Sequence, residues 1–271
     1  MMDIITTLFS YSFIMRAVIV GILVSLCSSV LGVSLVLKRY SMIGDGLSHV
    51  SFGALAIAAA LNSSPLMVSV PIVVLAAFFL LKISQNSFLG GDAVIAIFSS
   101  SALAVGIVVT SMTSGINADI CNYMFGSILA MSESDVYISV VLSIVVLILY
   151  FLFYNRIFAI TFDENFSRAT GSRVDFYNMA VAVLTAITIV LGMRIMGALL
   201  ISSLIIFPAL SAMRICRFFK GVILCSGIIS VLCFFTGIVI SYALEVPVGA
   251  SVVLVNLAVF MLSSLWAKIK A

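Results

Sequence analysis

The sequence predicts an all-α protein, a polytopic bundle of about eight or nine transmembrane helices. Hydrophobic residues make up 64% of the 271 residues and only 8% are charged, against roughly 25% in soluble domains. So few charges cannot cover a soluble surface, so the chain is expected to lie in a lipid bilayer. Its apolar runs are long and continuous, whereas a transmembrane β-barrel requires short segments of alternating polarity.

Each expected span is an apolar run of about the 20 residues needed to cross a bilayer. The runs follow one another closely, so residues 1–271 are predicted to form a single transmembrane domain. A polar corner at 40–46 separates the first two spans, and the apolar piece 123–131 is too short to span and is predicted to be interfacial or re-entrant. The expected spans are 13–37, 47–61, 66–81, 93–112, 136–154, 176–191, 196–213, 221–244 and 249–266.

The basic residues set the expected orientation, because the cytoplasmic loops of membrane proteins are enriched in Lys and Arg. With nine spans, the N-terminus lies outside and the C-terminus is cytoplasmic. Arg194 is the clear basic residue on the outer side. The residues on the inner side are Lys38, Arg39, Lys82, Arg156, Arg168, Arg173, Arg214, Arg217, Lys220, Lys268 and Lys270.

Charge and cysteine usage exclude other classes. The net charge of +3 is too small to suggest nucleic-acid binding. The five cysteines show no CxxC spacing, and no disulfide framework is expected. The longest polar loop has roughly 20 residues, too few for a nucleotide-binding domain, whose typical size is about 100 residues or more.

Asp45 and His49 are the candidate metal-path residues. His49 is the only histidine in the chain, and a spacing of four residues places both side chains on one helical face. A carboxylate and an imidazole can together hold a divalent transition metal, and ionisable groups at membrane depth usually mark a transport path. The alternative is structural, with Asp45 capping the helix or lying in its first turn and His49 packing inside the bundle.

Four motifs in order carry a family resemblance. Residues 31–49 read LGVSLVLKRYSMIGDGLSH, with a glycine, an apolar run, a basic pair and Asp-x-x-x-His. Residues 162–171 read FDENFSRATG, residues 197–209 begin GALLI and end FPA, and Ser241-Tyr242 precedes Pro247-Val248-Gly249. This series, which covers nearly the whole chain, resembles the membrane permeases of zinc, manganese and iron ABC importers, in particular the zinc permeases.

The resemblance implies a permease subunit that moves a divalent transition metal into the cytoplasm, with zinc first and manganese or iron as alternatives. The chain would not be an enzyme, because ATP would be hydrolysed by a separate cytoplasmic ATP-binding subunit. An extracytoplasmic metal-binding protein would deliver the ion, and a second permease copy would complete the pathway. The metal would be the substrate, with no permanently bound cofactor, and the chain would reside in a prokaryotic plasma membrane.

The resemblance also implies that residues 155–175 form a cytoplasmic segment that couples the permease to the ATPase. Within it, residues 162–169 are predicted to form one short helix whose phenylalanines, four residues apart, share an apolar face. The alternative is an interfacial helix resting on lipid. The expected coupling residues are Phe162, Asp163, Glu164, Phe166, Arg168 and Gly171, the last ending the helix.

Two other functions stay open. A related ABC permease for an iron chelate or a corrinoid would have a wide apolar path without selected ligands. A secondary ion carrier acting alone would show inverted repeats and more buried acids. With one histidine in the chain, any further metal ligands would be carboxylate, thiol, hydroxyl or backbone oxygen, so both zinc and manganese remain candidates.

Overall fold

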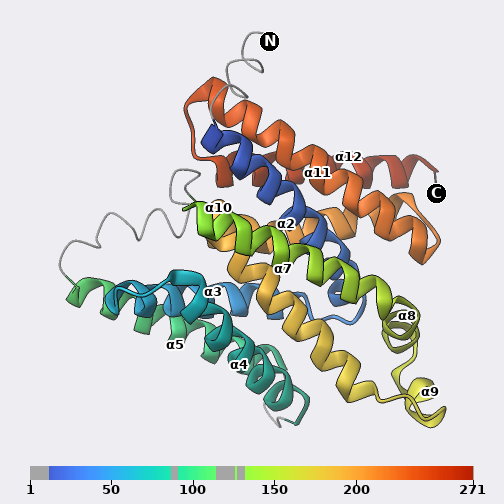
Figure 1. The fold of residues 1–271 in the computed structure, drawn as a ribbon. Coiled ribbons are helices and arrows are strands. Elements are labelled where there is room, and N and C mark those ends of the chain that lie inside the picture. The colour runs from blue at the N-terminus through green and yellow to red at the C-terminus, as the bar shows by residue number, and fades with distance from the viewer. Residues whose placement is uncertain (1–11, 87–90, 114–125, 127–131, 271) are drawn as a thin grey trace.

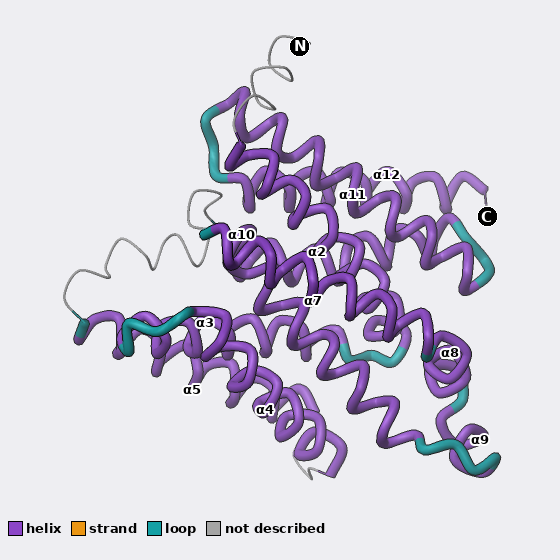
Figure 2. The backbone as a smooth tube through the Cα atoms, viewed as in Figure 1, coloured by secondary structure: helices purple, strands orange, loops and turns teal. Residues whose placement is uncertain are grey.

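The computed structural model describes residues 12–86, 91–113, 126 and 132–270, and its regular structure within these ranges is entirely helical (Figures 1 and 2). Nine segments of the described chain are long and apolar enough to cross a membrane, which confirms the predicted transmembrane bundle. The helices are α2 (Ser12–Leu37), α3 (Ser41–Ala60), α4 (Pro65–Asn86), α5 (Gly91–Met112), α7 (Glu133–Leu152), α8 (Tyr154–Phe162), α9 (Glu164–Ala169), α10 (Val174–Ile215), α11 (Phe219–Leu244) and α12 (Val248–Lys270). The short piece expected at 123–131 lies, apart from Gly126, outside the described residues.

Helices α2 and α10 form the centre of the bundle, with α11 and α12 on one side and α3, α4 and α5 on the other (Figure 1). The face of α2 that meets α10 and α11 is built from small residues, which let membrane helices approach closely. A side-chain carbon at Gly32 would lie 2.0 Å from the backbone oxygen of Ile205. Ser230 donates a hydrogen bond to the backbone oxygen of Ser25 at 3.0 Å. This close packing brings α2 and α10 into direct backbone contact.

Helix α10 consists of two spans joined at Gly197. The backbone there has φ 79° and ψ 166°, a conformation that only glycine adopts readily. A side-chain carbon at Gly192 would lie 2.3 Å from Ile201 Cδ1, so the chain turns back tightly and its two arms touch. The turn at Gly197 lies one residue inside the second expected span, 196–213, so this span begins slightly later than predicted.

Helix α3 begins at Ser41, so the expected polar corner at 40–46 and a span beginning at residue 47 are wrong. Asp45 is therefore the fifth residue of the helix and not its first. The glycines of this stretch, which favour a turn when read in sequence, serve instead for close packing. A side-chain carbon at Gly46 would lie 2.7 Å from Ile95 Cγ2 of α5.

The real corner needs only residues 38–40. Arg39 adopts the left-handed conformation with φ 61°. The N–H of Arg39 donates to the Val36 oxygen at 3.1 Å, and the N–H of Tyr40 donates to the Leu35 oxygen at 2.8 Å. This pair of hydrogen bonds is the Schellman motif that closes many helices. A corner closed in this way is short, and its backbone is fixed by its own hydrogen bonds.

Two ion pairs hold the N-terminal end of α7. Ser132 and Asp135 form a capping box at its first turn. The Asp135 carboxylate also lies 2.6 Å from Arg194 of α10, and both side chains are almost completely buried. Next to it, Glu133 pairs with Arg16 of α2 at 2.7 Å in an exposed position. Arg194, which sequence reasoning treats as an outer-side exception, is thus part of the packing, and Arg16 is a second basic residue at this end.

The expected single helix at 162–169 is wrong, because the chain divides it at Asp163. Helix α8 ends at Phe162, and Asp163 is the N-cap of α9, where its carboxylate accepts a hydrogen bond from the N–H of Phe166 at 2.8 Å. Aspartate competes well for this role because its short side chain reaches the free N–H groups of the first turn. Gly171, with φ 79°, follows the end of α9 as predicted.

The described cysteines, Cys27, Cys216, Cys225 and Cys233, are free thiols. This agrees with the expectation of no disulfide framework within the described part of the chain. Cys121 lies outside the described residues.

Candidate functional site

The Asp45 and His49 side chains lie on one face of α3, as their spacing predicts. Asp45 Oδ2 is 3.8 Å from His49 Nε2, and the two side chains are 44% and 25% exposed in the single chain. This separation is too long for a hydrogen bond. Two ligands that each lie about 2.1 Å from one metal ion are roughly 3–4 Å apart, so the pair has the spacing of two ligands to one ion.

Ser202, in the second arm of α10, fixes the other carboxylate oxygen. Its hydroxyl donates to Asp45 Oδ1 at 3.2 Å. Oδ2 is therefore the oxygen that faces His49. Sequence reasoning missed Ser202, because it lies 157 residues from Asp45 along the chain, between the GALLI and FPA segments that carry the motif.

Glycines bring Ser202 to this position. Ile205, three residues further along α10, lies against Gly32 of α2 and against Gly44 of α3, where a side-chain carbon would lie 3.2 Å from Ile205 Cδ1. The α10 arm can therefore approach both helices at once. A larger residue at Gly32 would push this arm away and separate Ser202 from Asp45.

The geometry tests the capping interpretation of Asp45. The N-cap of α3 is Tyr40, without a side-chain capping bond, and the first turn holds no acidic residue. The capping interpretation is therefore wrong. Within the described residues, no three His, Cys, Asp or Glu side chains gather as a metal site, so the described part of the chain provides a pair of such ligands here.

The expected coupling residues lie at the end of the bundle formed by α8 and α9. Phe166 is 66% exposed and Phe162 is 61% exposed, but they belong to different helices. Phe162 also contacts Phe158 and Phe219, with ring centroids 4.9 and 5.7 Å apart, so part of its role is to hold α8 against α11. Within α9 itself, Phe166 is the large apolar side chain that is exposed.

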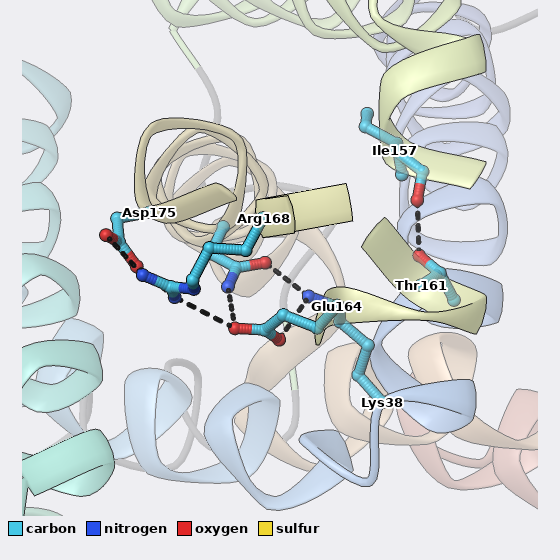
Figure 3. A network of polar contacts seen from close by, with 7 residues as sticks. Lys38, Ile157, Thr161, Glu164, Arg168 and Asp175 are labelled. Atoms are coloured by element: carbon cyan, nitrogen blue, oxygen red, sulfur yellow. Dashed lines mark hydrogen bonds and ion pairs between the residues drawn. The ribbon is translucent and has the colours of Figure 1, made fainter. Parts of the chain in front are cut away.

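The sequence predicts that the charged residues of α9 form a rim around its apolar face. In the structure, Glu164 and Arg168 also contact residues of the bundle. Arg168 binds Asp175 at 2.9 Å and approaches Glu164 at 3.5 Å (Figure 3). Glu164 in turn lies 3.4 Å from the Lys38 ammonium, at the end of α2. Asn178 of α10 also contacts Glu164, through an N–H that donates to Oε1 at 3.4 Å. Sequence reasoning gave no role to Lys38 or Asn178 in this cluster.

Comparisons with known proteins agree with this fold over nearly its whole length. Residues 10–267 match the ABC 3 transport family. The manganese import system permease protein ScaB of Streptococcus gordonii is 28% identical over 256 residues, which cover 94% of this chain and 92% of ScaB. The high-affinity zinc uptake system membrane protein ZnuB of Haemophilus influenzae is 29% identical over 254 residues, which cover 93% of this chain and 97% of ZnuB.

A solved structure, PsaBC from Streptococcus pneumoniae in complex with Fab, has a chain that superimposes with a TM-score of 0.87 at 29% identity, covering 96% of this chain and 94% of that one. Nearly the same stretch of sequence thus matches by family, by relatives and by fold. The family match contains eight of the nine apolar spans of the described residues and the ninth as far as residue 267. The chain is a multi-pass protein of the prokaryotic plasma membrane and belongs to the ABC 3 transport family.

Proposed function

We propose that this chain is the permease subunit of an ABC importer that moves a divalent transition metal into the cytoplasm. The observation that carries the proposal is the Asp45–His49 pair, 3.8 Å apart on one helical face, in a chain of the ABC 3 transport family. Two relatives are named as manganese and zinc transport proteins. The whole chain would act as one transmembrane domain, with residues 155–175 as its coupling segment.

In the proposed path, Asp45 and His49 replace some of the water around the arriving ion. Two protein ligands are enough to favour the ion at this depth but too few to trap it. Zinc is the first expected substrate, because the Irving–Williams order places it above manganese and iron at sites of this kind. Manganese is second, since a carboxylate and a hydroxyl are ligands that suit the harder ion.

A second copy of the chain would complete the site. In the single chain both side chains are partly exposed, yet ionisable groups within a membrane face the bundle interior or a water-filled cavity rather than lipid. A two-fold axis near this face of α3 would place two Asp45–His49 pairs opposite each other, with four protein ligands. Most oligomers of identical chains have such symmetry.

The permease itself would catalyse no bond chemistry. A cytoplasmic ATP-binding subunit would dock on the α8–α9 end, and an extracytoplasmic metal-binding protein would deliver the ion from the other side. Phe166 supports the docking, because an exposed aromatic side chain at the centre of an interface contributes strongly to binding. The interfacial-helix alternative, with Phe166 in lipid, remains the competing interpretation of the same exposure.

Cysteine labelling separates these two interpretations. In a variant without the native cysteines, Phe166→Cys is expected to react with a membrane-impermeant maleimide only from the cytoplasmic side, and to be protected when the ATPase binds. Ser167→Cys is the matched control, because Ser167 is only 2% exposed and should react slowly in either state. Labelling of residue 166 from outside would overturn the topology, and unchanged labelling with the ATPase bound would favour the lipid alternative.

The proposed function is tested by reconstitution. The chain, its cognate ATPase and its binding protein are placed in liposomes, and uptake of radioactive zinc and manganese is measured with and without ATP. ATP-dependent uptake of either ion supports the proposal. Uptake without the ATPase would favour a secondary carrier, and transport of an iron chelate or a corrinoid but not of free metal would favour the other class of ABC permease.

A further inference from the structure

Lys38 is a nearly buried charge at the junction of three elements. Its side chain is 9% exposed, although it follows directly after the end of α2. The ammonium donates to Glu164 Oε2 of α9 at 3.4 Å and to the side-chain oxygen of Asn178 on α10. Asn178 closes the triangle by donating to Glu164 Oε1 at 3.4 Å. We call Lys38, Glu164 and Asn178 the inner triad.

Stability alone does not explain the inner triad, because burying a charged group carries a desolvation penalty. Burial lowers the pKa of the Lys38 ammonium from its ordinary value, and the neighbouring Glu164 raises it. An apolar side chain of similar length would fill the same space, and replacing a buried ion pair by apolar groups is often neutral or stabilising. What the triad provides is geometry, because a buried polar network fixes the relative positions of the elements that it joins.

On one side, the triad is attached to the helix that carries Asp45 and His49. Lys38 opens the corner 38–40, whose backbone is fixed by hydrogen bonds to both the preceding and the following helix. Tyr40 accepts from the N–H of Ile43 at 3.0 Å, so the corner passes into the first turn of α3 without a flexible linker. A displacement of Lys38 is therefore transmitted to α3 rather than absorbed by a loop.

On the other side, the triad is attached to α9. Glu164 is the first residue of this helix, while Phe166 of the same helix is 66% exposed. Arg168 holds the far end of α9 to Asp175 at 2.9 Å (Figure 3). The helix thus presents an apolar side chain outward and a carboxylate inward to Lys38, so that a force applied to its outer surface acts on the triad.

We propose that the inner triad is the link through which movement of α9 against the ATPase reaches α3 and the Asp45–His49 pair. Lys38 and Glu164 are positioning residues, since neither touches the ion. The inference rests on the proposed function. The triad would connect the docking surface to the metal path. Lys38 and Glu164 lie 126 residues apart along the chain and meet only in the fold.

The test compares metal uptake with ATP hydrolysis in the reconstituted transporter. Lys38→Met is expected to leave assembly and ATP hydrolysis near wild type and to lower the metal transported per ATP by about tenfold, within the range for coupling residues that touch neither ligand. Glu164→Gln is expected to act in the same direction and keeps the folding of the bundle intact, because this side chain is 37% exposed. Lys82→Met is the matched control, since it removes an exposed lysine at the inner end of another span.

The charge swap Lys38→Glu with Glu164→Lys provides a rescue, because the Asn178 amide can donate to one partner and accept from the other in either arrangement. It should recover a large part of the transport per ATP. Normal transport per ATP in both single variants would overturn the inference and leave the proposed function untouched, whereas a wild-type complex without uptake would refute the proposed function itself. Loss of ATPase binding in both variants would also overturn the inference, since the triad would then build the docking surface rather than relay its movement.

Discussion

Asp45→Ala and His49→Ala are each expected to reduce metal uptake by about 100-fold, to background in a typical assay, if the lost ligand contributes roughly 3 kcal/mol to the passage of the ion. The physical reason is that each substitution removes one of the two protein ligands, which lie 3.8 Å apart. A dehydrated divalent ion within the membrane then lacks the charge or the nitrogen that replaces its water. Uptake of zinc and manganese into liposomes is the measurement.

The controls separate a ligand from a packing residue. Met42→Ala changes an exposed residue of the same helix and should leave uptake unchanged. Asp45→Asn keeps the size of the side chain and an oxygen that can accept from Ser202, so it should fold as wild type yet lose most uptake through the missing charge. Wild-type uptake in both alanine variants would show that the ion does not depend on this pair.

Asp135→Asn is expected to destabilise the folded chain by about 3–5 kcal/mol, the typical cost of removing one partner of a buried ion pair. The Asp135 carboxylate lies 2.6 Å from Arg194, and the two side chains are only 5% and 9% exposed. Without the carboxylate, the buried guanidinium loses the negative charge beside it, and α7 loses a contact with the turn of α10. Thermal unfolding in detergent and the yield of folded protein measure the effect.

Glu133→Gln is the matched control, two residues away on the same helix end. Its ion pair with Arg16 is 2.7 Å long but exposed, and such pairs contribute about 0–1 kcal/mol. The double variant Asp135→Asn with Arg194→Met should be more stable than Asp135→Asn alone, because it no longer buries the cation. If Asp135→Asn and Glu133→Gln unfold at the same temperature, the buried pair has no special role in stability.

The sequence by itself determined the class of the protein and the order of its spans. In lipid every backbone N–H and C=O must be satisfied within the chain, so a long apolar run is a helix, and hydropathy alone indicated eight or nine spans. The four-residue spacing of Asp45 and His49 placed them on one face, since that relation is local to a helix. Gly171 marked the end of α9 for the same reason, because its positive φ is a local property.

Only the tertiary structure decided where helices begin and which distant residues meet. The sequence predicts a polar corner at 40–46, but all of it after Tyr40 lies inside α3, where Gly44 and Gly46 allow close helix packing. Asp163 divided the expected helix, because its carboxylate accepts a capping hydrogen bond from the N–H of Phe166 while Phe162 packs against Phe219 of α11. Ser202 beside Asp45 and Lys38 beside Glu164 depend on how closely α10 and α9 approach α2 and α3. That approach is set by the volumes of side chains far apart in the sequence, which no local pattern records.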